Sequence, residues 1–269
     1  MSSSTFTSPA GRRRDAETFA EDGYLILRNV VPGDLCEAVA AEVRASLHPV
    51  LAPAEFEADV GYPGAPPSRQ AAGGDTPRRL LNAYARFPLL RPLVAGSRVV
   101  APLRELMGTE RVMLSQCHHN CIMTKSPGFS SVTLWHQDIR YWSFERPELI
   151  SLWLALGDET VDNGALMLIP GSHRESFDPA RLDEVKFLRP ELPENQALIG
   201  TARTIELNQG DVLLFHCRSF HAAGRNVTDQ AKLSAVFTYH AGDNRPLPGT
   251  RSAQYTSIPL HGDDRRQRT

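Results

Sequence analysis

The sequence Trp135-His136-Gln137-Asp138-Ile139-Arg140-Tyr141-Trp142, near the middle of the chain, places metal-ligand side chains among strand-forming residues. Side chains two positions apart on an extended segment point to the same face, so we expect His136 and Asp138 to face one point. One imidazole and one carboxylate are two members of the 2-His-1-carboxylate set that binds non-haem Fe(II) and leaves positions open for other ligands. We therefore expect a second histidine, from a distant part of the chain, to complete the site.

The His-x-Asp spacing is a weak signal alone, because roughly half a pair is expected by chance in a chain with 9 histidines. His261-Gly262-Asp263 has the same spacing in a polar, arginine-rich tail without strand formers, and we interpret it as coincidence. The central pair differs because strand-forming residues that can hold ligands rigidly surround it. These residues are Val132, Leu134, Trp135, Ile139, Tyr141 and Trp142.

The bulk properties describe an ordinary globular chain. Its 269 residues are 41% hydrophobic and 22% charged. A formal charge of −2 gives no electrostatic reason to expect nucleic acid or an anionic membrane as a partner. No apolar run approaches the roughly 18 residues that span a bilayer, and the N-terminus lacks the apolar core of a signal peptide. We expect a cytoplasmic protein.

The composition divides the chain into a disordered N-terminal arm, residues 1–14, and a single domain, residues 15–269. The arm is rich in Ser and Arg, contains no acidic residue and has no apolar face. Within the domain we expect a helical buttress over residues 15–108, a barrel core over about 109–240 and a C-terminal extension over 241–269.

The N-terminal part shows helical patterns around one strand. A short helix is expected at Asp15–Asp22, and an apolar strand at Tyr24–Val31. The next helix should begin at Asp34 as its N-cap, with Leu35, Val39, Val43 and Leu47 on its apolar face. Further helices are expected at Arg79–Phe87 and Ser97–Met107. Before these two helices, Ala52–Pro77 is rich in Gly, Pro and Ala, and its length makes it a candidate active-site lid.

After Gly108 the pattern changes to short apolar segments with turns between them. Helices followed by strands favour a β-sandwich or barrel buttressed by helices. In the segment around Trp153, Leu152, Leu154 and Leu156 alternate with Ser151, Trp153 and Ala155, which predicts two buried faces. The expected strands are Arg111–Thr124, Thr133–Tyr141, Leu149–Leu156, Leu166–Ile169, Thr201–Leu207, Val212–His216 and Lys232–His240.

Four downstream histidines are candidates for the third metal ligand. His173 follows a Pro-Gly-Ser turn and is expected to face solvent or cap a loop. His216 ends an apolar strand and suits a hydrogen-bonded core position, and His240 ends the last strand. His221 precedes Ala222-Ala223-Gly224, whose small side chains leave room around a metal. Spacing alone leaves the choice between His221 and the other three open.

The four cysteines are irregularly spaced, and we expect reduced thiols. A zinc site from Cys117, His118, His119 and Cys121 is the sharper alternative, because these ligand types fit zinc. A structural zinc site usually needs a second close pair, and the sequence does not offer one near Cys217.

Several segments together resemble the phytanoyl-CoA dioxygenase family of Fe(II)- and 2-oxoglutarate-dependent oxygenases. The resemblance begins at Phe19-Ala20-Glu21-Asp22-Gly23-Tyr24 and extends to about His240. It implies a mainly β protein with flanking α-helices, whose core is a double-stranded β-helix, a jelly-roll, cupin-like barrel with iron at its mouth. The blocks that carry it are Trp135-His136-Gln137-Asp138, Asp162-Asn163-Gly164-Ala165-Leu166-Met167-Leu168-Ile169-Pro170-Gly171-Ser172-His173, Gly210-Asp211-Val212-Leu213-Leu214-Phe215 and His221-Ala222-Ala223-Gly224-Arg225-Asn226.

Carried over residue by residue, the resemblance implies that His136, Asp138 and His221 bind the metal. It also places Trp153 in the wall of the 2-oxoglutarate pocket, where a plain core tryptophan is the alternative. His119, on the same strand face as Lys125, falls near another position of that pocket.

The family normally has an arginine eleven residues after the distal histidine, where it holds the far carboxylate of 2-oxoglutarate. Here that residue is Lys232, which keeps the charge but replaces a two-pronged donor by a point charge. Fe(II), one aspartate and the doubly charged keto acid leave one net negative charge, which needs a buried cation. Lys232 is the expected cation, Arg225 is the substitute, and an exposed surface lysine is the alternative without a function.

The activity that the resemblance implies is oxidation of an unactivated C–H bond of a small molecule with O2, releasing succinate and CO2. Halogenating relatives replace the aspartate by a small residue, so Asp138 predicts hydroxylation, or desaturation or ring closure. We expect Arg140 and Tyr141 to contact the substrate, and Arg140 would suit a carboxylate or phosphate; a surface salt bridge is the alternative. Amino-acid derivatives, secondary-metabolite intermediates and acyl chains all fit.

Two other classes compete with this function. One is a cupin-like metalloenzyme that does not use 2-oxoglutarate. The other is a catalytically silent binding protein of the same fold, which the lysine at position 232 could signal.

Overall fold

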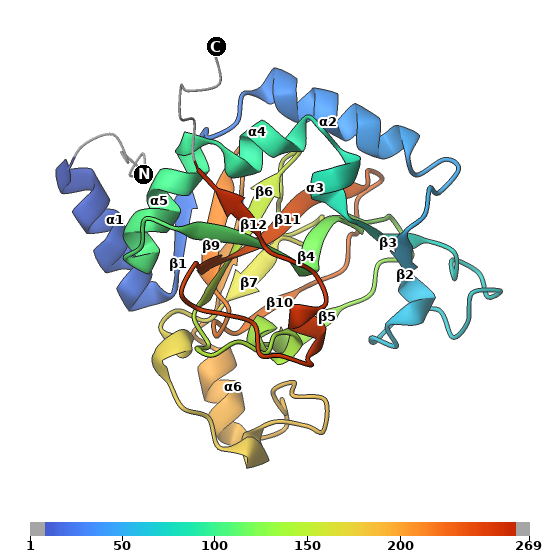
Figure 1. Ribbon diagram of the computed structural model, residues 1–269. Coiled ribbons are helices and arrows are strands. Elements are labelled where there is room, and N and C mark those ends of the chain that lie inside the picture. Colours follow the sequence, from blue (N-terminus) through green and yellow to red (C-terminus); the bar gives the residue numbers. More distant parts are fainter. Residues whose placement is uncertain (1–8, 262–269) are drawn as a thin grey trace, which may run out of the picture.

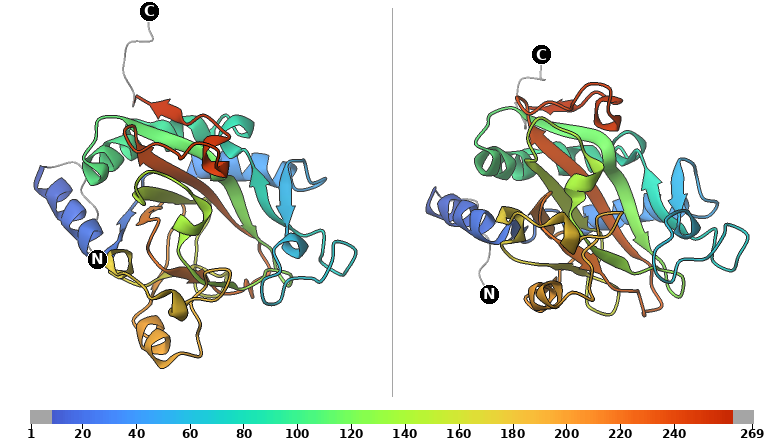
Figure 2. Two further views of the ribbon diagram at one scale, coloured as in Figure 1. Left: turned by 60° about the horizontal axis from the view of Figure 1, so that its bottom comes forward. Right: turned by 90° about the horizontal axis from the view of Figure 1, so that it is seen from below.

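Two facing antiparallel sheets form the centre of the molecule (Figure 1). The structure is a computed structural model that describes residues 9–261. The large sheet has the strand order β1-β9-β6-β11-β4-β3-β2, with β12 also paired to β4, and the small sheet has the order β5-β10-β7-β8. This is the mainly β, double-stranded β-helix that the sequence predicted, with the helices on its outside (Figure 2).

The strands of the large sheet are β1 (Tyr24–Leu27), β2 (Ala54–Phe56), β3 (Pro77–Leu81), β4 (Val112–Lys125), β6 (Leu149–Ala155), β9 (Val212–His216), β11 (Lys232–Ala241) and β12 (Ile258–Leu260). Those of the small sheet are β5 (Thr133–His136), β7 (Leu166–Leu168), β8 (Arg203–Ile205) and β10 (His221–Ala223). The helices are α1 (Pro9–Asp22), α2 (Gly33–Ala45), α3 (Ala83–Arg86), α4 (Leu90–Ala95), α5 (Ser97–Met107) and α6 (Pro193–Ile199). Five short 3-10 turns complete the chain: η1 (Glu57–Asp59), η2 (Asp138–Tyr141), η3 (Ser172–Arg174), η4 (Pro179–Arg181) and η5 (Arg251–Ala253).

The core has two layers, because the strands in the middle of the large sheet are buried on both faces. Leu152 and Leu154 of β6 pack with the helices on the outer face of the sheet. Trp153 and Ala155 point the other way, into the space between the two sheets. The alternation of β6 is therefore confirmed, and it follows from the two-residue period of a strand. Among residues 9–261, no helix combines the length and apolar character that a membrane crossing demands.

Helix α1 begins earlier than the sequence predicted. The expected disordered arm, residues 1–14, is wrong for residues 9–14, which are helical, while residues 1–8 lie outside the described part. Arg and Ala are good helix formers, and the helix also gains a partner because Arg12 Nε lies 4.0 Å from Glu105 Oε2 of α5. The strand expected at Tyr24–Val31 ends at Leu27, shortly before Asn29 takes a positive φ of 54°.

The helix predicted to begin at Asp34 differs from α2 in its N-cap and in its buried face. Helix α2 has Pro32 as its N-cap, and the Asp34 carboxylate accepts from the backbone N–H of Leu35 at 3.0 Å inside the first turn. Leu35, predicted on the apolar face, is 39% exposed, because the buried face is centred on Cys36, Val39, Ala40 and Val43.

The helix predicted at Arg79–Phe87 is mostly wrong. Arg79, Leu80 and Leu81 belong to β3, which pairs with β4, and only Ala83–Arg86 is helical. Pairing with β4 and the buried position of Leu80 favour the strand over the local helical pattern. The strand expected at Thr133–Tyr141 likewise ends at His136, and η2 follows at Asp138.

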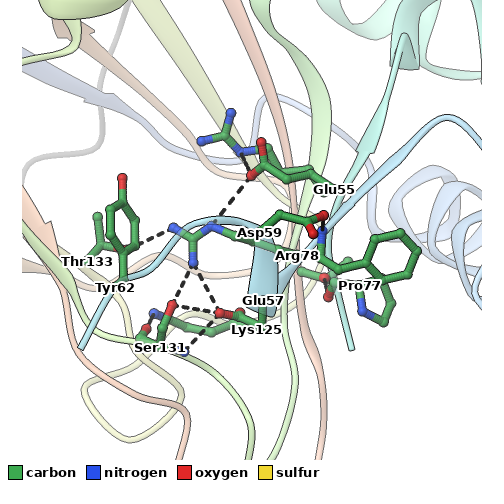
Figure 3. Close-up of polar contacts among 12 residues, drawn as sticks. Glu55, Glu57, Asp59, Tyr62, Pro77, Arg78, Lys125, Ser131 and Thr133 are labelled. Atoms are coloured by element: carbon green, nitrogen blue, oxygen red, sulfur yellow. Dashed lines mark hydrogen bonds and ion pairs between the residues drawn. The ribbon is translucent and has the colours of Figure 1, made fainter. Parts of the chain in front are cut away.

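The segment expected to be a long loop, Ala52–Pro77, contains β2 and η1 and is tied to the barrel by a buried polar network (Figure 3). The Glu57 carboxylate accepts from the Ser131 hydroxyl at 2.6 Å and from the Ser131 backbone N–H at 3.2 Å. Arg78 donates to the same hydroxyl at 2.9 Å and lies 3.5 Å from Glu57. A buried carboxylate with these partners fixes the start of the segment beside the mouth of the barrel.

We expect Glu57→Ala to lower the free energy of unfolding by about 3 kcal/mol, because it leaves two Ser131 donors buried without an acceptor and removes the carboxylate that pairs with the Arg78 guanidinium. Urea denaturation measures the loss. Glu110→Ala is the control, since its side chain is 92% exposed and its contact with Arg104 is 3.8 Å long. A loss in Glu57→Ala no larger than in the control would contradict this account of the network.

Candidate active site

The three predicted metal ligands converge inside the barrel. Strand β10 pairs with β5 so that His221 lies opposite His136. Gln137 keeps an extended backbone (φ −108°, ψ 134°), which turns Asp138 to the same side before η2 begins. Asp138 Oδ1 lies 3.6 Å from His136 Nε2 and 3.5 Å from His221 Nε2. Within residues 9–261, these three form the group of His, Cys, Asp or Glu side chains close enough to share a metal ion.

Both imidazoles are oriented by backbone carbonyls. His136 Nδ1 lies 2.8 Å from the Leu134 carbonyl, and His221 Nδ1 lies 3.1 Å from the Ser219 carbonyl. A ring whose Nδ1 donates to a carbonyl keeps a lone pair on Nε2, which is the atom that faces Asp138 here. Burial, together with the nearby His221, lowers the pKa of His136 to about 3, so this imidazole is neutral and able to bind a metal.

Asp138 carries the negative charge of the site. Burial alone would raise its pKa, but His119, His221 and His136 hold the pKa well below its usual value. Its Oδ1 is buried and has no hydrogen-bond donor, although it faces two Nε2 atoms. A buried, ionised oxygen without a donor is costly unless a cation completes it, so the donor set fits a divalent metal.

A second layer of side chains holds the other oxygen of Asp138. Ser151 Oγ donates to Asp138 Oδ2 at 3.2 Å, and His119 Nδ1 lies 3.5 Å from the same oxygen. His119 was predicted near the cosubstrate pocket, and it does line the cavity beside the triad. Ser151 was missed as a site residue. The available signal was its position two residues before Trp153 on β6, which places both side chains on the face toward the barrel interior.

A cavity opens from the triad between the two sheets. Its wall includes Trp153, Lys232 and Tyr141, as well as His119, all of which the sequence assigned to the site. Arg140 is half-buried and does not line the cavity itself, but it stacks on Tyr141 of the wall and on Phe187. Arg225, the substitute cation, is exposed and belongs to no part of the cavity wall in the described residues.

Lys232 is buried, so the alternative of a surface lysine is wrong. Its ammonium does not face the cavity as a free charge, because it donates to Glu159 Oε2 at 2.8 Å. The other oxygen of Glu159 accepts from Trp153 Nε1 at 2.8 Å and from Ser234 Oγ at 2.6 Å. Lys232 and Trp153 are thus linked through one buried carboxylate that the sequence analysis did not single out.

Lys125 is the cation that the sequence analysis overlooked as a site residue. It lies directly opposite Lys232 in the pairing of β4 with β11 and lines the same cavity. Its ammonium donates to the Ser131 carbonyl at 3.0 Å, and no carboxylate of residues 9–261 lies within ion-pair distance of it. Burial, with the neighbouring Lys232 and Arg78, lowers the pKa of Lys125 to about 7.

The zinc alternative is wrong, because its four residues do not converge. Cys117 packs in an apolar cluster with Trp142, whereas Cys121 packs in the core between the sheets. All four cysteines are free and buried, as expected of reduced thiols.

The competing histidines are also accounted for. His173 is buried rather than solvent-facing, and its ring packs 5.3 Å from that of His216. His240 Nδ1 lies 2.9 Å from the Ala241 carbonyl, and its Nε2 lies 2.8 Å from Ser257 Oγ. None of these three belongs to the group that could hold a metal ion, and His221 is the histidine that joins His136 and Asp138 in it.

The comparison with known families decides the class of protein. The model of the phytanoyl-CoA dioxygenase (PhyH) family matches residues 19–234. The chain belongs to the phytanoyl-CoA dioxygenase family. The resemblance seen in the sequence is thereby confirmed, and the match spans the helices beside the barrel as well as both blocks of metal ligands.

The chain is also similar to individual members of this group. It is 28% identical over 249 residues to ectoine dioxygenase of Sphingopyxis alaskensis, covering 86% of this chain and 76% of the relative. The crystal structure of the non-haem α-ketoglutarate-dependent epimerase SnoN from nogalamycin biosynthesis matches with a TM-score of 0.70 and 26% identity, over 95% of this chain and 97% of that one. The structure of EctD from S. alaskensis with 2-oxoglutarate and 5-hydroxyectoine has a TM-score of 0.72 at 22% identity, over 93% and 86% of the two chains, and shows the common fold.

This phytanoyl-CoA dioxygenase family member is an Fe(II)- and 2-oxoglutarate-dependent dioxygenase that acts on a small molecule, with O2 as the oxidant. The alternative of a cupin-like metalloenzyme that works without a keto acid is therefore set aside. The triad supplies the donor set that Fe(II) requires, and the buried Lys125 lines the same cavity.

We expect Asp138→Ala to weaken the binding of Co(II), a spectroscopic substitute for Fe(II), by more than about 100-fold, because loss of a second-layer partner alone typically costs 10- to 100-fold. Ser151→Ala should accordingly weaken it by about tenfold. The visible absorption of Co(II) during titration measures both. His261→Ala serves as the control from the other His-x-Asp pair and should bind like wild type; equal loss there would contradict the assignment.

Proposed function

We propose that this dioxygenase hydroxylates an unactivated C–H bond of a small-molecule substrate, with iron on His136, Asp138 and His221 and with 2-oxoglutarate on Lys125 and Lys232. The observation that carries the proposal is a buried ammonium without a carboxylate partner, Lys125, in the same cavity as the metal triad. The proposal extends the expected role of Lys232 to a pair of lysines.

The charges of the cavity wall support this assignment. Three of its four buried cations have a carboxylate partner, so each of these pairs is neutral. The pairs are Arg78 with Glu57 at 3.5 Å, Arg79 with Glu55 at 3.2 Å and Lys232 with Glu159 at 2.8 Å. Fe(II), Asp138 and doubly charged 2-oxoglutarate together leave one negative charge. Lys125, the fourth cation, is the one whose charge balances it.

The two lysines can share one carboxylate without breaking the contacts that they already make. An ammonium has three donors. Lys125 donates one hydrogen bond to the Ser131 carbonyl, and Lys232 donates one to the Glu159 carboxylate. The remaining donors suit the far carboxylate of the keto acid. Trp153 closes the wall behind them, held by its own bond to Glu159. A pair of lysines thus replaces the single two-pronged arginine of the family pattern.

Bound Fe(II) and 2-oxoglutarate supply the oxidising chemistry, and the protein contributes ligands, orientation and a dry cavity. Ser151 and His119 hold Asp138 so that one oxygen faces the metal position. Tyr62 of the segment after η1 lies over the mouth, with its hydroxyl 3.4 Å from that of Tyr141, and shields the cavity from water. Asp138 supplies a carboxylate at the position where halogenating relatives have a small residue, which favours hydroxylation over halogenation.

The segment Glu57–Thr76 acts as the lid of this cavity in our proposal. Tyr62 also packs edge-on against Phe187, with 5.7 Å between the ring centroids, so the segment touches both sides of the mouth. Arg140 and Tyr141 contact the substrate there. An amino-acid derivative or a secondary-metabolite intermediate suits this polar, aromatic mouth better than a long acyl chain does. Four free, buried thiols fit the reducing cytoplasm.

The proposal predicts that anaerobic addition of Fe(II) and then 2-oxoglutarate produces the weak visible charge-transfer band of an iron-bound keto acid. Admission of O2 with ascorbate present should then convert 2-oxoglutarate slowly to succinate and CO2 even without substrate, because ascorbate supplies the two electrons that reduce the second oxygen atom to water. The absence of the band in wild type would refute the proposal. A band without succinate would instead identify the catalytically silent binding protein.

The pKa of Lys125 predicts how 2-oxoglutarate binding depends on pH. A dianion binds the protonated amine, so affinity is highest below the pKa of about 7 in the free protein and falls as pH rises above it. The dissociation constant, read from the charge-transfer band, should rise about fivefold between pH 7 and pH 8.

Lys125→Arg is the matched variant for this test, because arginine stays charged over the whole range. It should still bind 2-oxoglutarate, but with little dependence on pH, while Lys125→Met should bind it weakly at every pH. The same pH profile in wild type and Lys125→Arg would remove Lys125 from the cosubstrate site.

A further inference from the structure

Arg140 has an unused hydrogen-bond donor, and its guanidinium stacks on Tyr141, a residue of the cavity wall. Its Nη1 is buried and has no hydrogen-bond partner, and the guanidinium forms none of the ion pairs found among residues 9–261. Burying such a donor without an acceptor costs roughly 1–3 kcal/mol, and more when the group is charged. A fold retains a cost of this size where a ligand later supplies the acceptor.

Aromatic rings hold the guanidinium in place. Its carbon lies 4.2 Å from the centroid of the Phe187 ring and 5.2 Å from that of Tyr141. Cation–π contacts of this kind orient an arginine without using its N–H donors, so the donors stay free for an anion. Both rings also meet the metal ligand His136 edge-on, at 5.7 Å and 6.0 Å between centroids. The ring of Phe187 or Tyr141 therefore lies between Arg140 and His136.

The backbone on both sides of this arrangement is fixed. Arg140 belongs to η2, where the N–H of the preceding Ile139 donates to the Cys217 carbonyl at 2.8 Å. Phe187 is held opposite, because its N–H donates to the Asp183 carboxylate at 2.8 Å and the next residue bonds to the Trp135 carbonyl at 2.9 Å. The position of the guanidinium relative to the triad is thus set by rigid neighbours rather than by a mobile side chain.

Charge completes the argument. With iron and 2-oxoglutarate bound as proposed above, Lys125 balances the remaining negative charge and the other lining cations are paired. Arg140 is then a positive charge without a counter-ion beside the place where substrate must bind. We propose that Arg140, stacked on Phe187 and Tyr141, binds an anionic group of the substrate, so that the enzyme oxidises small molecules that carry a carboxylate or a phosphate. The inference rests on the proposed function and adds the substrate class to it.

Inorganic sulfate is the probe, because it is small enough to reach the guanidinium whatever the rest of the substrate looks like. The protein is first loaded anaerobically with Fe(II) and saturating 2-oxoglutarate, so that the lysine pair is occupied, and the charge-transfer band confirms loading. For each protein, the rise in melting temperature is measured in about 50 mM sulfate relative to sodium chloride of equal ionic strength. This rise should be about 2–3 °C larger in wild type than in Arg140→Gln.

Two variants separate this effect from general stabilisation by sulfate. Arg69→Gln removes an arginine that also stacks on an aromatic ring, Phe56, at 3.2 Å, but that already pairs with Asp59 at 3.2 Å; it should respond like wild type. Arg140→Lys should respond in between, because it keeps the charge and loses the fork. An equal sulfate response in wild type and Arg140→Gln overturns the inference. Loss of the charge-transfer band in wild type would overturn the proposed function instead.

A second measurement needs no variant. Crystals of the loaded wild-type enzyme soaked in selenate, the anomalous scatterer of the same shape as sulfate, should show a selenium peak within hydrogen-bond distance of Arg140 Nη1. Occupied surface sites without a peak there would overturn the inference. Acetate and methyl phosphate then replace sulfate in parallel melting experiments, and the anion with the larger Arg140-dependent shift tells whether the substrate carries a carboxylate or a phosphate.

Discussion

The antiparallel pairing of β5 with β10 is the constraint on which the site depends. It sets His221 opposite His136, and the extended Gln137 then brings the Asp138 carboxylate between the two rings. Neither strand is long, so the alignment is secured by the surrounding sheets and by the carbonyls that fix each imidazole. A shift of one residue in this pairing would turn His221 to the outer face and dismantle the metal site. The register of two short strands is therefore a functional feature as much as a structural one.

Charge pairing explains why so many cations can line one cavity. An arginine or lysine buried alone would be expensive, and three of them are neutralised by glutamates that come from other elements. The two cations that no carboxylate of the described chain neutralises here, Lys125 and Arg140, are informative for that reason. Lys125 lies in the cavity wall opposite Lys232, and Arg140 stacks on Phe187 and on Tyr141, another residue of the wall. Two separate uncompensated charges suit two separate anions, the cosubstrate within and the substrate outside.

The sequence predicted the parts of this site that depend on short-range spacing. His136 and Asp138 follow from the two-residue period of a strand, and the two faces of β6 follow from the same rule. The order of the motifs then pointed to the family, and through it to His221. The helix expected at Arg79 failed because pairing with β4, a contact distant in sequence, outweighed the local pattern. Lys125 and Glu159 were missed for the same reason, because neither residue has a local signature. The role of Lys125 depends on the pairing of β4 with β11, and that of Glu159 on its contacts with the distant Lys232 and with Trp153.

Ser131 shows how the lid segment and the cosubstrate pocket are physically joined. Its hydroxyl donates to Glu57 and accepts from Arg78, while its carbonyl accepts from Lys125 (Figure 3). One residue thus fixes the base of the segment after η1 and the direction of the Lys125 ammonium, to which we assign the charge balance of 2-oxoglutarate. Because Glu57 and Lys125 both bond to Ser131, we expect a displacement of the segment to displace Lys125 as well. The order of the lid and the electrostatics of the pocket are consequently two properties of a single network, which is why the glutamate that closes it is buried so completely.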